Sequence, residues 1–256
     1  MKKIAILLSV LLMATSCDWF VFDNQEGYNA QIEGRIIDAE TGEVVQMGWP
    51  NNQRIEIIEW GWNDDNPESD KWYVKPNGTY RNKLVFAGKY TMDTRDRNFY
   101  PVQQDFEIKK GPNTVDFKVI PYVRIIDPVI TYEDGKIVAR CKVKASDPAK
   151  TPDVTVALFM FTDRWVSDGN NTVSGQKTTK LSKTKLADGE TVLEMTVDPT
   201  ITSGMQFVYE REHFLRIGAY AAGSGVNSSK RYNYSPVYKM SRDFKTVTEV
   251  TNWDEE

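Results

Sequence analysis

The stretch Gln31-Ile32-Glu33-Gly34-Arg35-Ile36-Ile37-Asp38 decides the fold class of this chain. We interpret it as a β-strand that ends in the turn Asp38-Ala39-Glu40-Thr41-Gly42. From Ala30 onward the chain repeats this arrangement, with short strand-like runs between turn signals and almost no helical periodicity. The sequence therefore predicts an all-β protein.

Further strands are expected on both sides of a break at Pro121-Tyr122. Before the break lies a hairpin-type turn, Pro76-Asn77-Gly78-Thr79, in which Gly78 supplies a positive φ. The expected strands before the break cover residues 54–60, 71–74, 84–86, 89–94, 102–108 and 114–120. The expected strands after it cover residues 123–126, 136–143, 154–161, 177–186, 191–197, 214–222 and 235–240.

The two series predict two β-sandwich domains in tandem, residues 30–121 and residues 122–241. Seven short strands separated by turns are typical of a sandwich, and this pattern describes the second series. The last residues, 242–256, end in three consecutive acids, so we expect a solvated acidic tail. The alternative is that Trp253 docks this tail on the second domain.

The N-terminus has the pattern of an exported lipoprotein. Lys2 and Lys3 precede a short apolar run at 4–14, and small residues then lead to Cys17. A bilayer span needs about 20 residues, so a cleaved signal is expected instead. Because the ending resembles a bacterial lipobox, we expect residues 1–16 to be a lipoprotein signal peptide. Cys17 is then the lipidated first residue of the mature chain, and residues 17–29 form a tether.

The net charge and the number of cysteines argue against a nucleic-acid partner and against a disulfide bond. The formal net charge is −4, and loss of Lys2 and Lys3 with the signal takes it to −6, which argues against a nucleic-acid partner. If Cys17 carries lipid, Cys141 has no second cysteine with which to form a disulfide. The run 137–144 alternates apolar and cationic side chains, which predicts a strand with Cys141 facing inward.

The sequence offers little for catalysis. His213 is the single histidine, and it follows charged residues, so we expect it at a solvated strand edge rather than in a catalytic triad. A lone histidine with one thiol makes a poor zinc site, and the sequence has no phosphate-binding glycine loop. We therefore expect no cofactor and no catalytic residue. A carboxylate pair, which is what a glycoside hydrolase requires, is the enzymatic alternative that the residue content leaves open.

Aromatic residues are the best candidates for a binding surface. Trp60 and Trp62 are two apart, so they share a face if the strand continues, while Trp72 and Tyr73 lie in a flanking segment. Trp165 lies in a polar loop of the second domain. A flat indole can stack on the C–H face of a sugar ring and also offers a polar N–H. The alternative for each of these rings is packing in a sandwich core.

An oxygen-rich segment follows the tryptophan pair. Asp64, Asp65 and Asp70 could supply several of the oxygen ligands that calcium requires. The segment lacks the alternating acidic spacing of a dedicated calcium loop. A solvated loop is therefore the favoured interpretation, and no metal site is expected.

Three glycine-containing motifs connect the first domain with a known fold. Gly34-Arg35-Ile36-Ile37-Asp38-Ala39-Glu40-Thr41-Gly42-Glu43, Asn77-Gly78-Thr79-Tyr80 and Ala87-Gly88-Lys89-Tyr90 resemble a carboxypeptidase-regulatory-like domain, a transthyretin-type sandwich of seven strands. The second domain is similar to a generic immunoglobulin or fibronectin-like pattern. With the lipobox, the whole chain resembles the Bacteroides-type lipoproteins of domain-of-unknown-function family 3823. The segments 46–52 and 63–70 depart from the usual first-domain pattern.

This resemblance implies a surface-exposed outer-membrane lipoprotein of a kind often encoded among glycan capture and import genes, with no catalytic residues to carry over. We therefore expect a non-catalytic protein that is attached to the outer membrane by its lipid and faces the cell exterior. Its expected partners are a polysaccharide and the components of an outer-membrane glycan transporter. Two alternatives stay open: a structural module that docks a protein partner without glycan affinity, and a carboxylate-based glycoside hydrolase.

Overall fold

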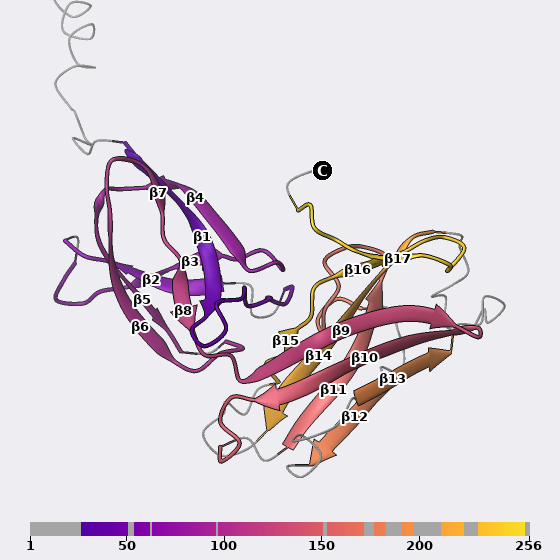
Figure 1. The fold of residues 1–256 in the computed structure, drawn as a ribbon. Helices are drawn as coiled ribbons and strands as arrows, with labels where there is room; N and C mark the ends of the chain where they lie inside the picture. Colours follow the sequence, from indigo (N-terminus) through magenta and orange to yellow (C-terminus); the bar gives the residue numbers. More distant parts are fainter. Residues whose placement is uncertain are drawn as a thin grey trace, which may run out of the picture.

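The structure is a computed structural model that describes residues 27–50, 54–61, 63–95, 97–150, 153–171, 177–182, 191–196, 211–222 and 230–253. All the regular elements in this part of the chain are β-strands, so the predicted all-β class is confirmed. None of the described residues forms a helix that could cross a bilayer. The strands form two units, β1 to β8 and β9 to β17, which lie next to each other in Figure 1.

The first unit is a sandwich of two sheets. Its strands are β1 (Ala30–Asp38), β2 (Arg54–Glu59), β3 (Ser69–Tyr73), β4 (Thr79–Val85), β5 (Gly88–Thr94), β6 (Val102–Ile108), β7 (Gly111–Thr114) and β8 (Phe117–Val119). One sheet has the order β4-β1-β7, with β8 also paired to β1, and the other has the order β3-β2-β5-β6. β1 is antiparallel to β4 but parallel to β7 and β8. It is therefore central to its sheet, and its buried residues Ile32 and Ile36 belong to the core of this unit.

Two glycines allow close approaches around β1. At Gly34, a Cβ atom would lie 1.7 Å from the carbonyl oxygen of Val115, so the chain fits there only without a side chain. Gly78 has a φ of 74°, as its turn motif predicted, and its carbonyl oxygen accepts a hydrogen bond of 2.9 Å from the Ile36 N–H. Both motif glycines thus hold neighbouring segments against the central strand.

The second unit also has two sheets. Its strands are β9 (Val123–Glu133), β10 (Lys136–Ala145), β11 (Asp153–Phe161), β12 (Lys177–Ser182), β13 (Thr191–Thr196), β14 (His213–Ala222), β15 (Asn233–Tyr234), β16 (Tyr238–Met240) and β17 (Val247–Glu249). One sheet has the order β13-β10-β9. The other has the order β12-β11-β14-β16-β17, with β15 paired to β14.

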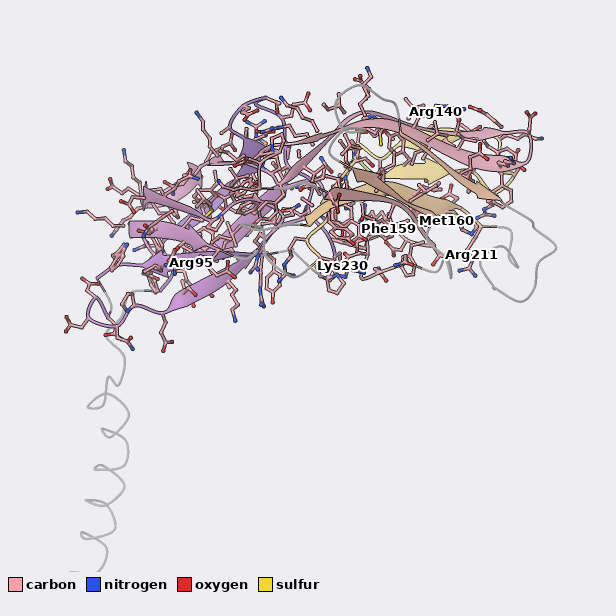
Figure 2. The ribbon with its side chains drawn as sticks, turned by 90° about the horizontal axis from the view of Figure 1, so that it is seen from below. Arg95, Arg140, Phe159, Met160, Arg211 and Lys230 are labelled. Atoms are coloured by element: carbon pink, nitrogen blue, oxygen red, sulfur yellow. The ribbon has the colours of Figure 1, made fainter. Side chains whose placement is uncertain are left out.

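Successive side chains of β11 point to opposite faces of its sheet and so contribute to two apolar clusters in the second unit. Met160 lies in the core between the two sheets, which also contains Cys141, so the predicted inward orientation of this cysteine is confirmed. Phe159, the preceding residue, lies on the other face of β11 and packs with Tyr232 and Tyr234. Figure 2 labels Phe159 and Met160 side by side in this strand. The second sheet is therefore covered on both faces.

Two predictions for the second unit are wrong. His213 is fully buried instead of lying at a solvated edge, and its ring stacks on Phe244 with 5.9 Å between ring centroids. Residues 242–253 do not form a solvated tail: β17 pairs with β16, and Trp253 is only 8% exposed, as expected under the alternative in which Trp253 docks this segment. The two errors have one cause, because Phe244 belongs to the segment that was expected to be in solvent.

A buried arginine joins the two units. Arg216 in β14 is fully buried, and its guanidinium donates hydrogen bonds to Met47 O at 2.7 Å and to Pro76 O at 2.9 Å in the first unit. Within its own unit it donates to Ser235 O at 2.8 Å and lies 4.4 Å from the ring centroid of Tyr234. Burial lowers the pKa of Arg216 to about 9, so the side chain is still charged at neutral pH.

An ion pair and an amide form further contacts at this junction. Arg124 Nη2 donates to Asp38 Oδ1 at 2.9 Å, and the two side chains are only 7% and 6% exposed. Asn233 donates across the junction to Asn98 O at 2.8 Å. Since these contacts join the end of β1 and the loop between β5 and β6 to strands β9 and β15 of the other unit, they fix the two sandwiches relative to each other.

The segment 46–52, which departs from the expected first-domain pattern, contributes to the same junction. Met47 is fully buried, and the ring of Trp49 lies 4.8 Å from that of Trp165 in the second unit. Gln46 accepts a hydrogen bond from Arg216 at 3.3 Å. The described part of this segment, residues 46–50, therefore contacts the second unit.

The Asp38 contact predicts that the junction weakens in acid. Burial raises the pKa of Asp38, but hydrogen bonds from Arg124 and the Glu40 N–H outweigh it, so the net pKa lies below the usual 3.8. A carboxylate with a lowered pKa contributes stability above its unfolded pKa and loses it as the pH falls through the folded pKa. We expect Asp38→Asn to lower the Tm at pH 7, and this deficit to shrink below about pH 4.

Thermal unfolding at several pH values checks this expectation. Asp127→Asn is the matched control, because Asp127 is an exposed carboxylate 3.4 Å from Lys142 in the same region of β9. We expect the control to change the Tm little at either pH. A deficit for Asp38→Asn that is equal at neutral and acid pH would contradict the charge-based account of this contact.

Candidate functional site

One surface of the β3-β2-β5-β6 sheet is turned away from the core, and we call it the outer face. In β5, Tyr90 and Met92 point into the core, so Lys89, Thr91 and Asp93 point outward. The side chains that β6 places opposite these three are also polar: Glu107, Asp105 and Gln103. The outer face therefore carries aligned rows of hydrogen-bonding groups.

Trp60 lies at one end of the outer face, directly after β2. Its backbone N–H donates to Lys89 O at 2.9 Å, and its indole Nε1–H donates to Thr91 Oγ1 at 2.7 Å. The Thr91 hydroxyl in turn donates to Asp105 Oδ1 at 2.7 Å. This chain of hydrogen bonds fixes the plane of the indole while the side chain remains 36% exposed. The site thus presents a positioned aromatic surface.

Two hollows lie on the outer face. The first has a volume of about 610 Å³, and the residues that border it with outward side chains are Trp60, Lys89, Thr91, Gln103, Asp105 and Glu107. The second has a volume of about 320 Å³ and is lined by Glu56, Ile58, Pro67, Ser69, Asp93 and Arg95. Both combine apolar surface with carboxylate, hydroxyl or cationic groups, which is the composition of a site for a polar ligand.

The structure separates the aromatic candidates that flank Trp60. Trp72 is buried, at 4% exposure, and packs against Tyr80 and Tyr90, so its ring faces the core. Tyr73, the next residue, is 59% exposed and lies on the outer face opposite Arg54. The ring of Trp72 is therefore part of the core, which was the alternative given for it, whereas Tyr73 lies on the accessible side.

The continuing strand on which Trp60 and Trp62 were expected to share a face is not present. β2 ends at Glu59, and Gly61 has a φ of 97°, which turns the chain away from the strand direction. Trp62 itself lies outside the described residues, as does Cys17. The condition for a shared face, a strand that continues past Trp60, is therefore not met.

Trp165 belongs to the junction between the units. Its ring lies between those of Trp49 and Trp253, at 4.8 Å and 5.9 Å between centroids. The neighbouring Ser167 hydroxyl donates to the Trp49 carbonyl oxygen. Packing between units, rather than a ligand surface, accounts for the position of this ring.

The three aspartates that were the weaker, calcium-binding alternative to a solvated loop do not come together as a group. Asp64 accepts a hydrogen bond of 2.6 Å from the Gly61 N–H, and Asp70 accepts one of 3.1 Å from the indole of Trp72. Asp65 is exposed. In the part of the chain that the structure describes, no three His, Cys, Asp or Glu side chains are grouped so that they could hold a metal ion.

The polar partners of Trp60 were not predicted from the sequence. Thr91 and Asp105 lie 14 residues apart and meet only because β5 and β6 pair in a particular register. The available signal was the alternation of polar and apolar residues within 88–94 and 102–108, which marks one side of each strand as outward.

Comparisons with known proteins agree with this fold. Residues 30–120 match the family model described as "Protein of unknown function (DUF3823) N-terminal domain". The chain has no match among curated proteins. A solved structure from Bacteroides uniformis, described as a "putative carbohydrate binding protein", is 31% identical with a TM-score of 0.69. That match covers 88% of this chain and 100% of the other.

Two solved DUF3823 family structures share the fold at lower identity. The protein from Parabacteroides merdae is 20% identical with a TM-score of 0.64, and the match covers 84% of this chain and 99% of that one. The protein from Bacteroides ovatus is 19% identical with a TM-score of 0.64, over 83% and 99% of the two chains. Together with the family model and the relative from Bacteroides uniformis, they confirm the resemblance found in the sequence, and the chain belongs to the DUF3823 family.

Proposed function

We propose that this chain is a non-catalytic carbohydrate-binding lipoprotein whose outer face holds the sugar. The observation that carries the proposal is the Trp60 ring, which is exposed at the first hollow and held in place through Thr91. The relative from Bacteroides uniformis, described as a "putative carbohydrate binding protein", supports the same class of ligand.

The chemistry of the first hollow suits a sugar. An indole face stacks on the axial C–H groups of a pyranose and removes apolar surface from water. Asp105, Glu107 and Gln103 offer acceptors and an amide at the rim, where sugar hydroxyls would lie. Because Trp60 is already fixed by two hydrogen bonds, little conformational entropy is lost when a ligand stacks on it.

The carboxylates at this hollow argue for binding rather than hydrolysis. Asp105 and Glu107 are two residues apart on β6, so their Cα atoms are about 7 Å apart. A glycosidase places its two carboxyl groups on either side of the scissile bond. Both side chains here rise from the same strand and would contact the same side of a ligand lying on the sheet.

A substitution at the ring tests the proposal. Trp60→Ala is expected to weaken binding of a polysaccharide at least about tenfold, because the stacking surface is lost. Affinity electrophoresis of the mature chain through gels containing starch, xyloglucan, galactomannan or arabinoxylan measures this as reduced retardation. Leu84→Ala is the matched control, since Leu84 is 65% exposed on β4 of the other sheet. Equal retardation of the two variants would contradict a binding role for Trp60.

The location is the second part of the proposal. Lipid on Cys17 attaches the protein to the outer membrane, with the two sandwiches facing the cell exterior and close to the components of a glycan transporter. The lipobox-like ending at Cys17 supports the lipid anchor, and the resemblance to surface-exposed lipoproteins of this family supports the outer membrane and the exterior face. More than one acyl chain is needed for stable attachment, since a single chain binds a bilayer only reversibly.

Replacement of the anchor residue tests the location. In cells labelled with radioactive palmitate, Cys17→Ala is expected to abolish incorporation and to release the protein from the membrane fraction. Cys141→Ala is the matched control, because this buried thiol lies inside the second unit. Labelling that persists in Cys17→Ala would overturn the assignment of the anchor.

A further inference from the structure

We infer that the ligand is an extended, uncharged glycan chain that crosses the outer face and occupies both hollows. This inference rests on the proposed function, and it adds the length and the charge class of the ligand. It is carried by two features of the outer face: the position of the second hollow and the balance of its charges.

The two hollows lie diagonally on one sheet face. The first is over β5 and β6 at the Trp60 end, and the second is over β3, β2 and β5. Ile58 lines the second hollow and Thr91 lines the first, and because these two residues are register partners the hollows adjoin there. From Trp60 to Glu56 the face extends about 13 Å along β2, at about 3.3 Å per residue. A monosaccharide cannot reach both hollows, whereas a chain of several sugars can.

The second hollow has the groups of a sugar subsite. Ile58 and Pro67 provide apolar surface, and Ser69 provides a hydroxyl. Arg95 Nε and Nη2 donate to Asp93 Oδ1 and Oδ2 at 3.2 Å and 3.0 Å, so the guanidinium and carboxylate form a planar pair. Figure 2 shows Arg95 at the surface of the first unit. Such a pair offers both donors and acceptors to vicinal hydroxyls.

The charges of the outer face favour a neutral ligand. Each cation that borders the hollows has an acid beside it: Lys89 is the register partner of Glu107, and Arg95 pairs with Asp93. Near the first hollow, Asp105 adds a further negative charge. A uronate or sulfated polymer would place its anions against these carboxylates, and like charges in contact weaken binding. A neutral polysaccharide meets no such repulsion.

Length dependence tests the two-hollow arrangement. Isothermal titration calorimetry of the mature chain would use neutral oligosaccharides of two to eight units, taken from whichever polymer retards it in gels. We expect affinity to rise at least about tenfold once the oligosaccharide is long enough to span both hollows. Arg95→Ala should remove that gain while leaving the shortest ligand that binds unaffected. Arg81→Ala is the control, because Arg81 is an exposed arginine 3.6 Å from Glu33 on the other sheet.

Charge dependence tests the ligand class. A neutral polymer that binds is compared with its carboxymethylated derivative, which we expect to bind at least about tenfold more weakly at low salt. Binding that does not change with length, or that improves on carboxymethylation, would overturn this inference and leave the proposed function in place. If no polymer retards the protein, both the proposed function and this inference are overturned.

Discussion

Replacing Arg216 with methionine is expected to lower the free energy of unfolding by about 3–5 kcal/mol. This is the usual cost of removing one partner from a buried, charged hydrogen-bond network. The methionine fills much of the space. The carbonyl oxygens of Met47 and Pro76, however, lose their buried donors and gain no water in exchange. Because the loss falls between the two sandwiches, we expect calorimetry to show one unfolding transition for the native protein and two for the variant.

Arg140→Met is the matched control for this experiment. Arg140 forms an exposed ion pair with Glu133, with 2.8 Å between the charged atoms. Figure 2 shows Arg140 at the surface of the second unit, on the side opposite Lys230. Exposed ion pairs contribute about 1 kcal/mol or less, so this variant should stay close to the native protein. If Arg216→Met lost less than about 1 kcal/mol and unfolded in one transition, the arginine would not be what joins the units.

Gly34→Ala is expected to cost about 3 kcal/mol or more, because the new methyl group meets backbone rather than a side chain that can rotate away. The added Cβ would lie 1.7 Å from Val115 O, so β1 or the segment between β7 and β8 must move. That movement breaks the hydrogen bond of 3.0 Å from the Val115 N–H to Glu33 O. Urea unfolding monitored by tryptophan fluorescence measures the loss.

Gly88→Ala provides the comparison for Gly34→Ala. At Gly88 the nearest atom to an added Cβ is Tyr90 Cε2 at 3.8 Å, which is an ordinary van der Waals contact. We expect a change within about 0.5 kcal/mol for this variant. Similar unfolding midpoints for the two alanine variants would contradict the close contact between Gly34 and Val115.

Local patterns were enough to predict the fold class. Alternation marked the strands and the inward position of Cys141, and the turn motif predicted the positive φ of Gly78, because each depends on residues next to one another in the sequence. The burial of His213 could not be predicted in this way, and the burial of Trp253 could be given only as an alternative. Each is covered by a segment distant in the sequence, and the isolated chain gives no measure of such coverage.

The candidate site was predictable only in part. Trp60 and Tyr73 were identified as aromatic candidates, and both lie on the outer face. Trp72 was grouped with them, although adjacent residues of a strand point to opposite faces and Trp72 therefore points into the core. The partners that fix Trp60 come from β5 and β6, whose register is a property of the folded sheet. The junction was missed for the same reason, although the apolar Met47 and Trp49 within 46–52 were its signal.

The most direct test of the central claim, that sugar binds at Trp60, is an NMR titration of the indole N–H signals. The chain has seven tryptophans, and loss of one signal in Trp60→Ala assigns that residue. With a neutral oligosaccharide that binds, we predict a shift of the Trp60 signal, while those of buried Trp72 and of Trp165 at the junction stay in place. Saturable binding that leaves the Trp60 signal unmoved, or that shifts the Trp165 signal instead, would contradict the account.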